Sequence, residues 1–381
     1  MRVRCLVFML LALAMNAQEL TDQIRAAQSS GNYAEAAALY ERLIASGSDA
    51  PEIRSNYGVM LHLAGKNSEA MTQFRMALER KPSLAGANLF AGLTEIDLNA
   101  PALALPYLKR AQEADPSQPA PLLGLAKARV ALRQYAAAND SYKKAAALDP
   151  KLAEAWYGQG VTDRSVAEEL LSHGSRNGHG TNANRQRVQA LLADALKSLT
   201  RALDLEPNSV RAHLVMAEAL SDAGKATEAV AEYQTALRLD PRLLGAYLGL
   251  ASLYWKQREF DEALPLLQQV LQRSPRDPEA NGMMADIAEH AGKNAEAEEY
   301  ATVALAGNPD LIQTRVVLAR VYVAKQEPRR AIIELTKVIG ADPDGSYHFL
   351  LYRAYRQAGD EASAKLALAK FQQLRKGNPQ P

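Results

Sequence analysis

The chain has 381 residues and a nearly balanced charge, with 44 lysine and arginine residues against 43 aspartate and glutamate residues. This balance gives the protein no large excess of positive charge, so we expect neither nucleic acid nor an anionic membrane as a partner. The single cysteine, Cys5, lies in the first few residues, and a mature chain without it could form no disulfide, thiol nucleophile or cysteine-ligated metal site.

Residues 1–17 have the pattern of a signal peptide. Arg2 and Arg4 form a basic start, and an apolar run that is too short to span a bilayer follows up to Ala14. Small residues allow cleavage after Ala14 or after Ala17. We therefore expect a periplasmic or secreted protein, with an uncleaved anchor or a first solenoid helix as the alternatives.

Prolines recur at a fixed spacing through the rest of the chain. Their positions rise in equal steps of thirty-four, except for one step of fifty-seven between Pro150 and Pro207. Self-similarity at a period of this length predicts a repeat architecture in which each unit is one supersecondary structure. The repeating prolines are Pro82, Pro116, Pro150, Pro207, Pro241, Pro275, Pro309 and Pro343.

Other positions of the period predict two helices in each unit. An alanine stands twelve positions before every repeating proline, and an alanine or valine stands five before it. Eight positions before the proline is a bulky apolar residue such as Phe74 or Tyr233, with Ala301 as the exception. Small residues allow two helices to cross closely, the bulky residue fills the space beside them, and proline ends the second helix.

This pattern resembles the tetratricopeptide repeat (TPR) family from about Gln18 to the C-terminus. The family's opening Trp-x-x-Leu-Gly-x-x-Tyr is mostly degraded, but Trp156 and Gly160 keep part of it in one unit, and Ala251 and Tyr254 keep part in another. The resemblance implies an all-α fold, a right-handed superhelical solenoid of antiparallel helix pairs.

The expected organisation follows the repeat. Glycines such as Gly65 and Gly224 mark turns within units, where a left-handed helix C-cap is needed. The aspartates of Asp-Pro pairs mark the turns between units and could cap the next helix. The expected segments are a signal peptide at 1–17, four units and the first helix of the fifth at 18–164, an inserted helical hairpin at 165–190, the rest of the fifth unit and units six to nine at 191–344, a capping helix pair at 345–377 and a disordered tail at 378–381.

The insertion of 23 residues distinguishes the fifth unit from the others. Its first helix should continue past Leu171, its second should resume near Gln186, and the Gly-, Ser-, Asn- and His-rich tip at 172–184 should be mobile. His173 and His179 flank the tip, but two histidines six residues apart without cysteine are a weak metal signal. We expect no metal and no other cofactor.

The sequence offers no catalytic motif. It contains no HExxH, GxxxxGK[ST], GxSxG or CxxC pattern. Ser141 and Lys144 match a Ser-x-x-Lys nucleophile pattern, but Tyr142 between them should belong to the core and turn both to the surface. The repeats also leave no residues for a separate catalytic domain, so we expect no enzyme activity.

In proteins of this type, the first helices of successive units line a concave groove, and here an apolar stripe with isolated charges would suit a peptide. The alternative is that many of these residues make ordinary contacts between helices. The family's carboxylate clamp is not matched at Ser55, Val59, Leu89 and Leu93, so binding of chaperone C-terminal tails is not expected. The expected groove residues are Val59, His62, Leu63, Leu89, Leu93, Ile96, Leu123, Lys127, Tyr157, Val161, Arg164, Trp255, Arg320, Phe349 and Arg353.

These features predict a non-catalytic scaffold or adaptor that binds a peptide or protein segment in the groove. One alternative is an accessory subunit of a cell-envelope enzyme or of a secretion or assembly complex, contacting it through the hairpin at 165–190. Another is glycan binding, although only Tyr157 and Trp255 approach the row of aromatic residues that it requires. A solenoid sequence specifies a surface and not a ligand, so the partner and the oligomeric state stay open.

Overall fold

The computed structural model describes residues 18–176, 182–342 and 344–377, and these contain helices and no strand. This confirms the expected all-α fold. A helix covers residues 18–29. It is followed by α2 (Tyr33–Ala45), α3 (Pro51–Leu63), α4 (Asn67–Arg80), α5 (Ala85–Asp97), α6 (Pro101–Ala114), α7 (Pro119–Ala131), α8 (Tyr135–Leu148), α9 (Ala153–Arg176) and α10 (Asn182–Leu205). The remaining helices are α11 (Val210–Asp222), α12 (Ala226–Leu239), α13 (Leu244–Lys256), α14 (Phe260–Arg273), α15 (Pro278–His290), α16 (Asn294–Gly307), α17 (Ile312–Ala324), α18 (Pro328–Thr336), the 3₁₀ helix η1 (Ile339–Ala341), α19 (Ser346–Ala358) and α20 (Glu361–Gly377).

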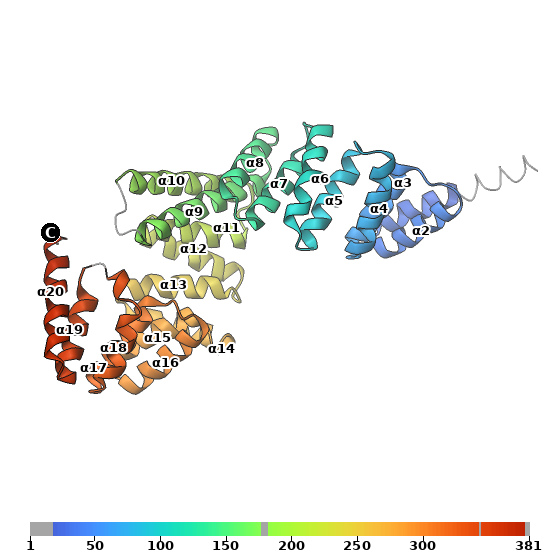
Figure 1. Cartoon of the computed structure of the whole chain (residues 1–381). Coiled ribbons are helices and arrows are strands. Elements are labelled where there is room, and N and C mark those ends of the chain that lie inside the picture. The colour runs from blue at the N-terminus through green and yellow to red at the C-terminus, as the bar shows by residue number, and fades with distance from the viewer. Residues whose placement is uncertain (1–17, 177–181, 343, 378–381) are drawn as a thin grey trace, which may run out of the picture. The chain divides into compact units, whose positions relative to one another are not determined.

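The chain divides into two compact units whose limits fall inside α9, inside α10 and between α10 and α11. The first holds the chain up to Val166 together with Lys197–Pro207, and the second holds Ala167–Leu196 and the chain from Asn208 on. Within each unit, consecutive helices pack in pairs, such as α3 with α4 in the first and α15 with α16 in the second (Figure 1). None of the described helices combines the length and the hydrophobicity that a membrane crossing requires.

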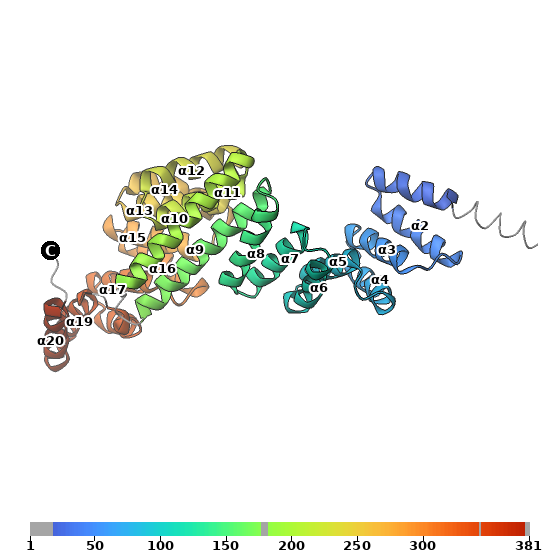
Figure 2. The ribbon, with the colours of Figure 1, turned by 90° about the horizontal axis from the view of Figure 1, so that it is seen from above.

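The insertion lengthens one helix pair. In Figures 1 and 2, α9 and α10 run side by side, and each has 24 residues where α3 has 13 and α4 has 14. Ala167, Val188 and Leu192 are buried together between the two helices. The expected tip at 172–184 was too long, because α9 continues to Arg176 and α10 begins at Asn182 instead of near Gln186. Residues 177–181 of that tip lie outside the described residues, as do residues 1–17.

The small and bulky positions of the period form the core, as the sequence predicted. The alanine twelve positions before each repeating proline is fully buried, as at Ala70 and Ala229, and the bulky partner is fully buried in cases such as Phe74. Some helix crossings are closer than any side chain would allow. A Cβ added to Gly249 would lie 2.4 Å from the ring of Tyr233, so α13 can approach α12 only because glycine stands there.

A second regularity lies at the turns between repeats and was not foreseen from sequence. In several repeats, the carbonyl oxygen of the repeating proline accepts a hydrogen bond from the side chain six residues later, and the donor group differs from one repeat to the next. The donors are Asn88 Nδ2 to Pro82 (2.8 Å), Trp156 Nε1 to Pro150 (3.0 Å), Tyr247 Oη to Pro241 (3.4 Å), Asn281 Nδ2 to Pro275 (3.1 Å) and Arg315 Nε to Pro309 (3.0 Å). In these repeats the residue at this position satisfies the turn carbonyl, and Trp156 is one of several donors that do so. Leu122, six residues after Pro116, has no side-chain donor.

The aspartates between repeats act differently from the expectation. Asp115, Asp149 and Asp240 each accept a hydrogen bond from the backbone N–H two residues later, at 3.1, 2.9 and 2.9 Å. They stabilise the turn, whereas the N-cap residues of α7 and α13 form no side-chain cap. Two other aspartates do reach the following helix. The Asp342 carboxylate accepts from the backbone N–H of His348 at 3.0 Å, and Asp277, the N-cap of α15, accepts from the backbone N–H of Ala280 at 2.9 Å.

The turns within repeats require a left-handed residue, and this position is not always glycine. Gly65, Gly224 and Gly292 have φ of 77°, 75° and 74°, as expected, but Gln326 occupies the same position with φ of 59°. A left-handed conformation costs a non-glycine residue about 1–2 kcal/mol. The turn after α17 therefore carries local strain.

We expect Gln326→Gly to raise the free energy of unfolding by about 0.5 kcal/mol. The glycine removes the left-handed penalty, and its greater freedom in the unfolded chain offsets part of the gain. Chemical denaturation of both proteins measures the difference. Gly292→Gln is the matched reverse change and should destabilise by about 0.5–1 kcal/mol. If both substitutions destabilised the protein, the strain at this turn would be refuted.

Candidate protein-binding groove

The first helices of the last repeats form two adjoining hollows in the second unit. The tryptophan pocket lies between α13, α15 and α17, and the arginine pocket lies between α17 and α19. Together they make the C-terminal groove, and Gln313 of α17 borders both. The tryptophan pocket is lined by Ser252, Trp255, Glu279, Gly282, Met283, Asp286, Leu311, Gln313, Thr314 and Val317. The arginine pocket is lined by Gln313, Val316, Arg320, Asp344, Ser346, Tyr347, Phe349, Leu350 and Arg353.

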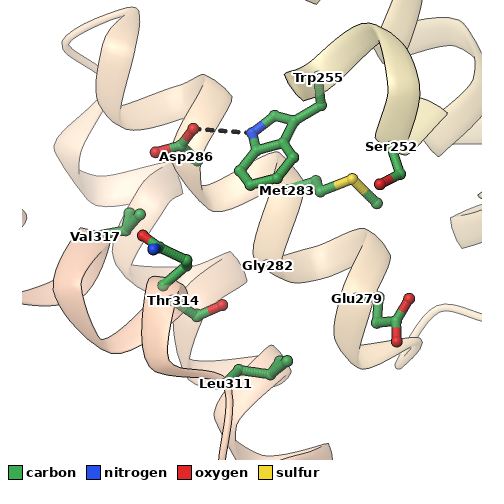
Figure 3. Close-up of a pocket in the computed structure, with 10 residues that line it drawn as sticks. Ser252, Trp255, Glu279, Gly282, Met283, Asp286, Leu311, Thr314 and Val317 are labelled. Carbon is green, nitrogen blue, oxygen red and sulfur yellow. Dashed lines mark hydrogen bonds between the residues drawn. The ribbon is translucent and has the colours of Figure 1, made fainter. Parts of the chain in front are cut away.

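The tryptophan pocket has an apolar interior and a polar rim (Figure 3). Trp255 forms one wall, while Met283 and Val317 are buried at 7% and 2% exposure. Gly282 has no side chain, and a Cβ there would lie 2.7 Å from Thr314 Oγ1. This glycine lets α17 approach α15 closely.

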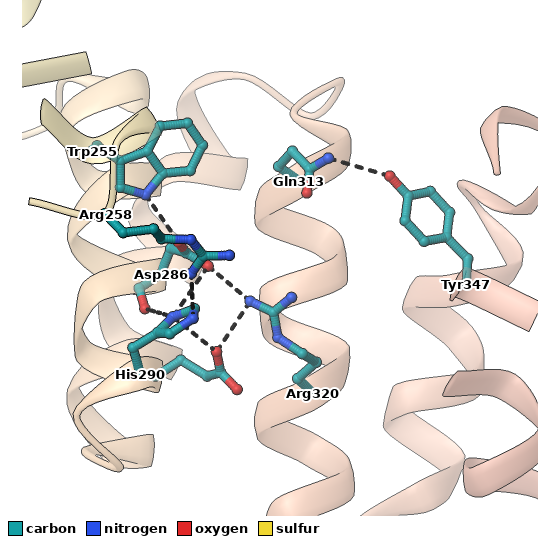
Figure 4. A network of polar contacts seen from close by, with 8 residues as sticks. Trp255, Arg258, Asp286, His290, Gln313, Arg320 and Tyr347 are labelled. Carbon is teal, nitrogen blue, oxygen red and sulfur yellow. Dashed lines mark hydrogen bonds and ion pairs between the residues drawn. The ribbon is translucent and has the colours of Figure 1, made fainter. Parts of the chain in front are cut away.

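A buried carboxylate fixes the wall of this pocket (Figure 4). Asp286 is 7% exposed and accepts hydrogen bonds from Trp255 Nε1 at 2.9 Å and from Arg320 Nη2 at 2.7 Å. Arg320 also pairs with Glu289 at 3.0 Å. Because a buried charge is costly unless it is paired, Asp286 holds the indole of α13 and the guanidinium of α17 in fixed positions.

The same network extends to His290 at the end of α15. Arg258 Nη1 donates a hydrogen bond to His290 Nε2, so the ring carries its proton on Nδ1, which lies 2.9 Å from the carbonyl oxygen of Asp286. Ligand atoms of Asp286, Glu289 and His290 lie within 4.8 Å of one another, a spacing that a metal ion could use. Arg320 and Arg258 already contact these atoms, so the arrangement functions as an ion-pair network.

The arginine pocket is lined by two guanidinium groups, those of Arg320 and Arg353, and by one carboxylate, that of Asp344. Gln313 Nε2 donates to Tyr347 Oη at 3.3 Å. Phe349 is 41% exposed and stacks against Phe371 of α20 with ring centres 5.1 Å apart. Hydrogen bonds from Ser346 lower the pKa of the Asp344 carboxyl. Arg353 is exposed and forms no ion pair with any described residue.

The structure brings together the expected groove residues of the second unit. Trp255 and Arg320 meet through Asp286, and Arg320, Phe349 and Arg353 line one pocket. In the first unit, several expected residues are partly buried and pack against core clusters. These are Val59, Leu89, Ile96 and Leu123.

The expected residues of the first unit include two whose polar groups already have partners. His62 Nδ1 lies 3.0 Å from Thr94 Oγ1, and Lys127 Nζ forms an ion pair with Glu154 at 2.8 Å. Leu63 is 44% exposed, while the others are intermediate in exposure. Those residues are Leu93, Tyr157, Val161 and Arg164.

Sequence reasoning missed Asp286, Gln313 and Tyr347, although a signal was present. Asp286 and Arg320 are 34 residues apart, and so are Gln313 and Tyr347. Residues one period apart occupy equivalent positions on neighbouring first helices and face each other. Both pairs could have been found by aligning the sequence with itself at an offset of 34 residues and searching for side chains that can form a hydrogen bond or an ion pair.

Comparison with known proteins agrees with this geometry, which is that of a helical-repeat protein. Tetratricopeptide repeat family models match residues 21–85, 65–119 and 123–162 and residues 189–242, 220–287 and 254–304. Together these matches cover more than half of the chain, and the chain belongs to the tetratricopeptide repeat family. Proteins of this family are protein-interaction scaffolds and are generally non-catalytic.

Similar proteins come from distant organisms. The TPR repeat-containing protein YpiA of Bacillus subtilis is 25% identical over 295 residues, which cover 73% of this chain and 69% of YpiA. Anaphase-promoting complex subunit 7 of mouse is 26% identical over 175 residues, covering 44% of this chain and 31% of that subunit. Most of the subunit's length therefore has no counterpart here.

Solved structures show similar folds. The Pseudomonas aeruginosa pilF structure has a TM-score of 0.49 at 19% identity and covers 62% of this chain and 97% of its own. The structure of YrrB, described as a TPR protein with an unusual peptide-binding site, has a TM-score of 0.42 at 20% identity and covers 58% of this chain and 97% of its own.

Proposed function

We propose that this chain is a non-catalytic scaffold whose C-terminal groove holds a segment of a partner protein. The observation that carries the proposal is the pair of adjoining pockets on consecutive first helices. One has an apolar interior, and both have charged groups at the rim. Concave, mostly apolar sites with a few placed polar groups are typical of ligand recognition. The Asp286 network supports a preformed site, because it orders the pocket wall without a ligand.

A pull-down with the full chain from an extract of the source organism tests the groove. The Trp255→Ala/Phe349→Ala variant removes one aromatic side chain from each pocket and should lose a partner that the unaltered chain captures. Leu366→Ala is the matched control, because Leu366 is an apolar residue on α20 with 75% exposure and does not line either pocket. Circular dichroism must show that both variants remain helical. A partner lost equally with the control variant would contradict the groove.

We also propose that the protein is exported, on the basis of its basic and apolar first residues. Expression in a bacterium with its own N-terminus, followed by fractionation and N-terminal sequencing, tests this. The expected result is a periplasmic or secreted chain that begins at Met15 or Gln18. A chain that keeps Met1 and stays in the cytoplasmic fraction would overturn the proposal.

A second candidate function is that of an accessory subunit that contacts its complex through the hairpin at 165–190. The length of α9 and α10 favours it, as does Leu171, which is 49% exposed near the end of the hairpin. The matched mammalian relatives are subunits of the anaphase-promoting complex, so their names are compatible with such a role. Deletion of 173–184 separates the two functions, because the groove predicts unchanged capture of the partner and the hairpin predicts its loss.

A further inference from the structure

The two pockets differ in the sign of the exposed side chain that has no ion-pair partner among the described residues. In the tryptophan pocket, Asp286 is neutralised by Arg320, whereas Glu279 at the rim is exposed and has no hydrogen-bond or ion-pair partner among the described side chains. In the arginine pocket, Arg320 is committed to Asp286 and Glu289, while Arg353 is exposed and has no ion-pair partner in the described part of the chain. Glu279 and Arg353 therefore stand at the rims of adjoining pockets without an ion pair to any described residue. Asp344 is a second carboxylate at the arginine pocket, where it accepts a hydrogen bond from the backbone N–H of Ser346 at 2.9 Å.

The apolar surfaces beside these charges fit side chains of opposite kinds. A lysine or arginine could lay its aliphatic stem along Trp255 and Met283 and place its cation at Glu279. A glutamate or aspartate could contact Arg353 beside Phe349, where the guanidinium can donate two hydrogen bonds to one carboxylate. Charge complementarity therefore predicts a basic side chain in the tryptophan pocket and an acidic side chain in the arginine pocket.

Gln313 provides a contact between the two pockets. Its Nε2 is held by Tyr347 Oη at 3.3 Å, and its side chain is exposed and borders both hollows. The amide oxygen is left to accept a backbone N–H from a segment that crosses α17. An extended segment has such donors along its whole length.

Building on the proposed scaffold function, we infer that the C-terminal groove binds an extended peptide segment with a basic residue in the tryptophan pocket and an acidic residue in the arginine pocket. Glu279 is on α15 and Arg353 is on α19, with α17 between them. Packed helices lie about 8–10 Å apart, so two such steps are about 16–20 Å. An extended chain advances about 3.3 Å per residue, and the two charges should thus stand about six residues apart.

The test uses a random dodecapeptide library displayed on phage and selected against the full chain. Enriched peptides should share a basic and an acidic residue about five to six positions apart. Fluorescence anisotropy with the synthetic peptides should show about tenfold weaker binding to Glu279→Lys and to Arg353→Glu. The double variant Glu279→Lys/Arg353→Glu should instead prefer the peptide whose two charges have been exchanged. Lys365→Glu, an exposed charge reversal on α20, is the control and should leave binding unchanged.

The outcomes separate this inference from the function on which it rests. Peptides whose binding depends on Trp255 but not on Glu279 or Arg353 would overturn the charge assignment and keep the groove. Failure to enrich any peptide, or equal binding to Trp255→Ala, would refute both the groove and the inference. Recovery of the charge-exchanged peptide by the double variant would establish the assignment, because a general loss of structure cannot invert a preference.

Discussion

Gly158→Val should lower the free energy of unfolding by about 3 kcal/mol, through overpacking of a closed helix crossing. Gly158 lies in α9, opposite Tyr142 of α8, and a Cβ there would lie 2.3 Å from the Tyr142 ring. Tyr142 is itself only 6% exposed, so the ring has little room to move away. Chemical denaturation followed by circular dichroism measures the loss.

Gly86→Ala is the matched control for that prediction. Gly86 is in the first turn of another first helix, α5, and nothing lies within 4 Å of the position of its Cβ. Alanine has the higher helix propensity, so this change should raise the free energy of unfolding by about 0.5 kcal/mol. An unchanged stability for Gly158→Val would show that the repeats are not packed in the register described here.

Asp342→Ala should cost about 3 kcal/mol, because it removes a buried acceptor shared by three donors. The Asp342 side chain is 1% exposed. Its carboxylate accepts from the backbone N–H of Gly345 at 2.9 Å, from that of His348 at 3.0 Å and from His348 Nδ1 at 2.6 Å. Without it, these donors are left buried at the start of α19.

Two substitutions control for the role of Asp342. Asp342→Asn keeps one carbonyl oxygen and should lose about half as much stability, while Asp240→Ala removes only the single turn bond to Arg242 and should cost about 0.5–1 kcal/mol. The start of α19, to which Asp342 is hydrogen-bonded, supplies Ser346 and Tyr347 to the arginine pocket, so Asp342→Ala should also weaken the binding of any partner to this pocket. If Asp342→Ala and Asp240→Ala had equal effects, the buried acceptor would have no special role.

Much of the fold could be predicted because it is local in sequence. A repeat contacts mainly its neighbours, so the spacing of small residues, bulky residues and prolines already contains the information on which helices pack together. Ala229 and Phe74 occupy the core positions that the period assigns to them. The left-handed turns at Gly65 and Gly224 follow for the same reason, since the preference of glycine is a property of the backbone.

The candidate site was predicted only in part. Trp255, Arg320, Phe349 and Arg353 were expected in a binding groove because each belongs to a first helix. They line the two pockets, and that these pockets bind a partner stays a prediction. The sequence around these four residues does not distinguish them from Val59 or Leu89, which pack against the core. Whether a side chain at a given position is open or covered depends on the size of its neighbours in the adjacent repeats.

The sequence by itself determined the repeat, the helix pairs, the core positions and the absence of a known catalytic motif, because these depend on patterns within one period. Only the tertiary structure decided which residues meet across periods. Asp286 reaches Trp255 and Arg320, and Gln313 reaches Tyr347, because neighbouring first helices pack side by side. The physical reason is that a hydrogen bond or a pocket requires its groups at a particular distance and angle, and the packing of helices against one another sets both.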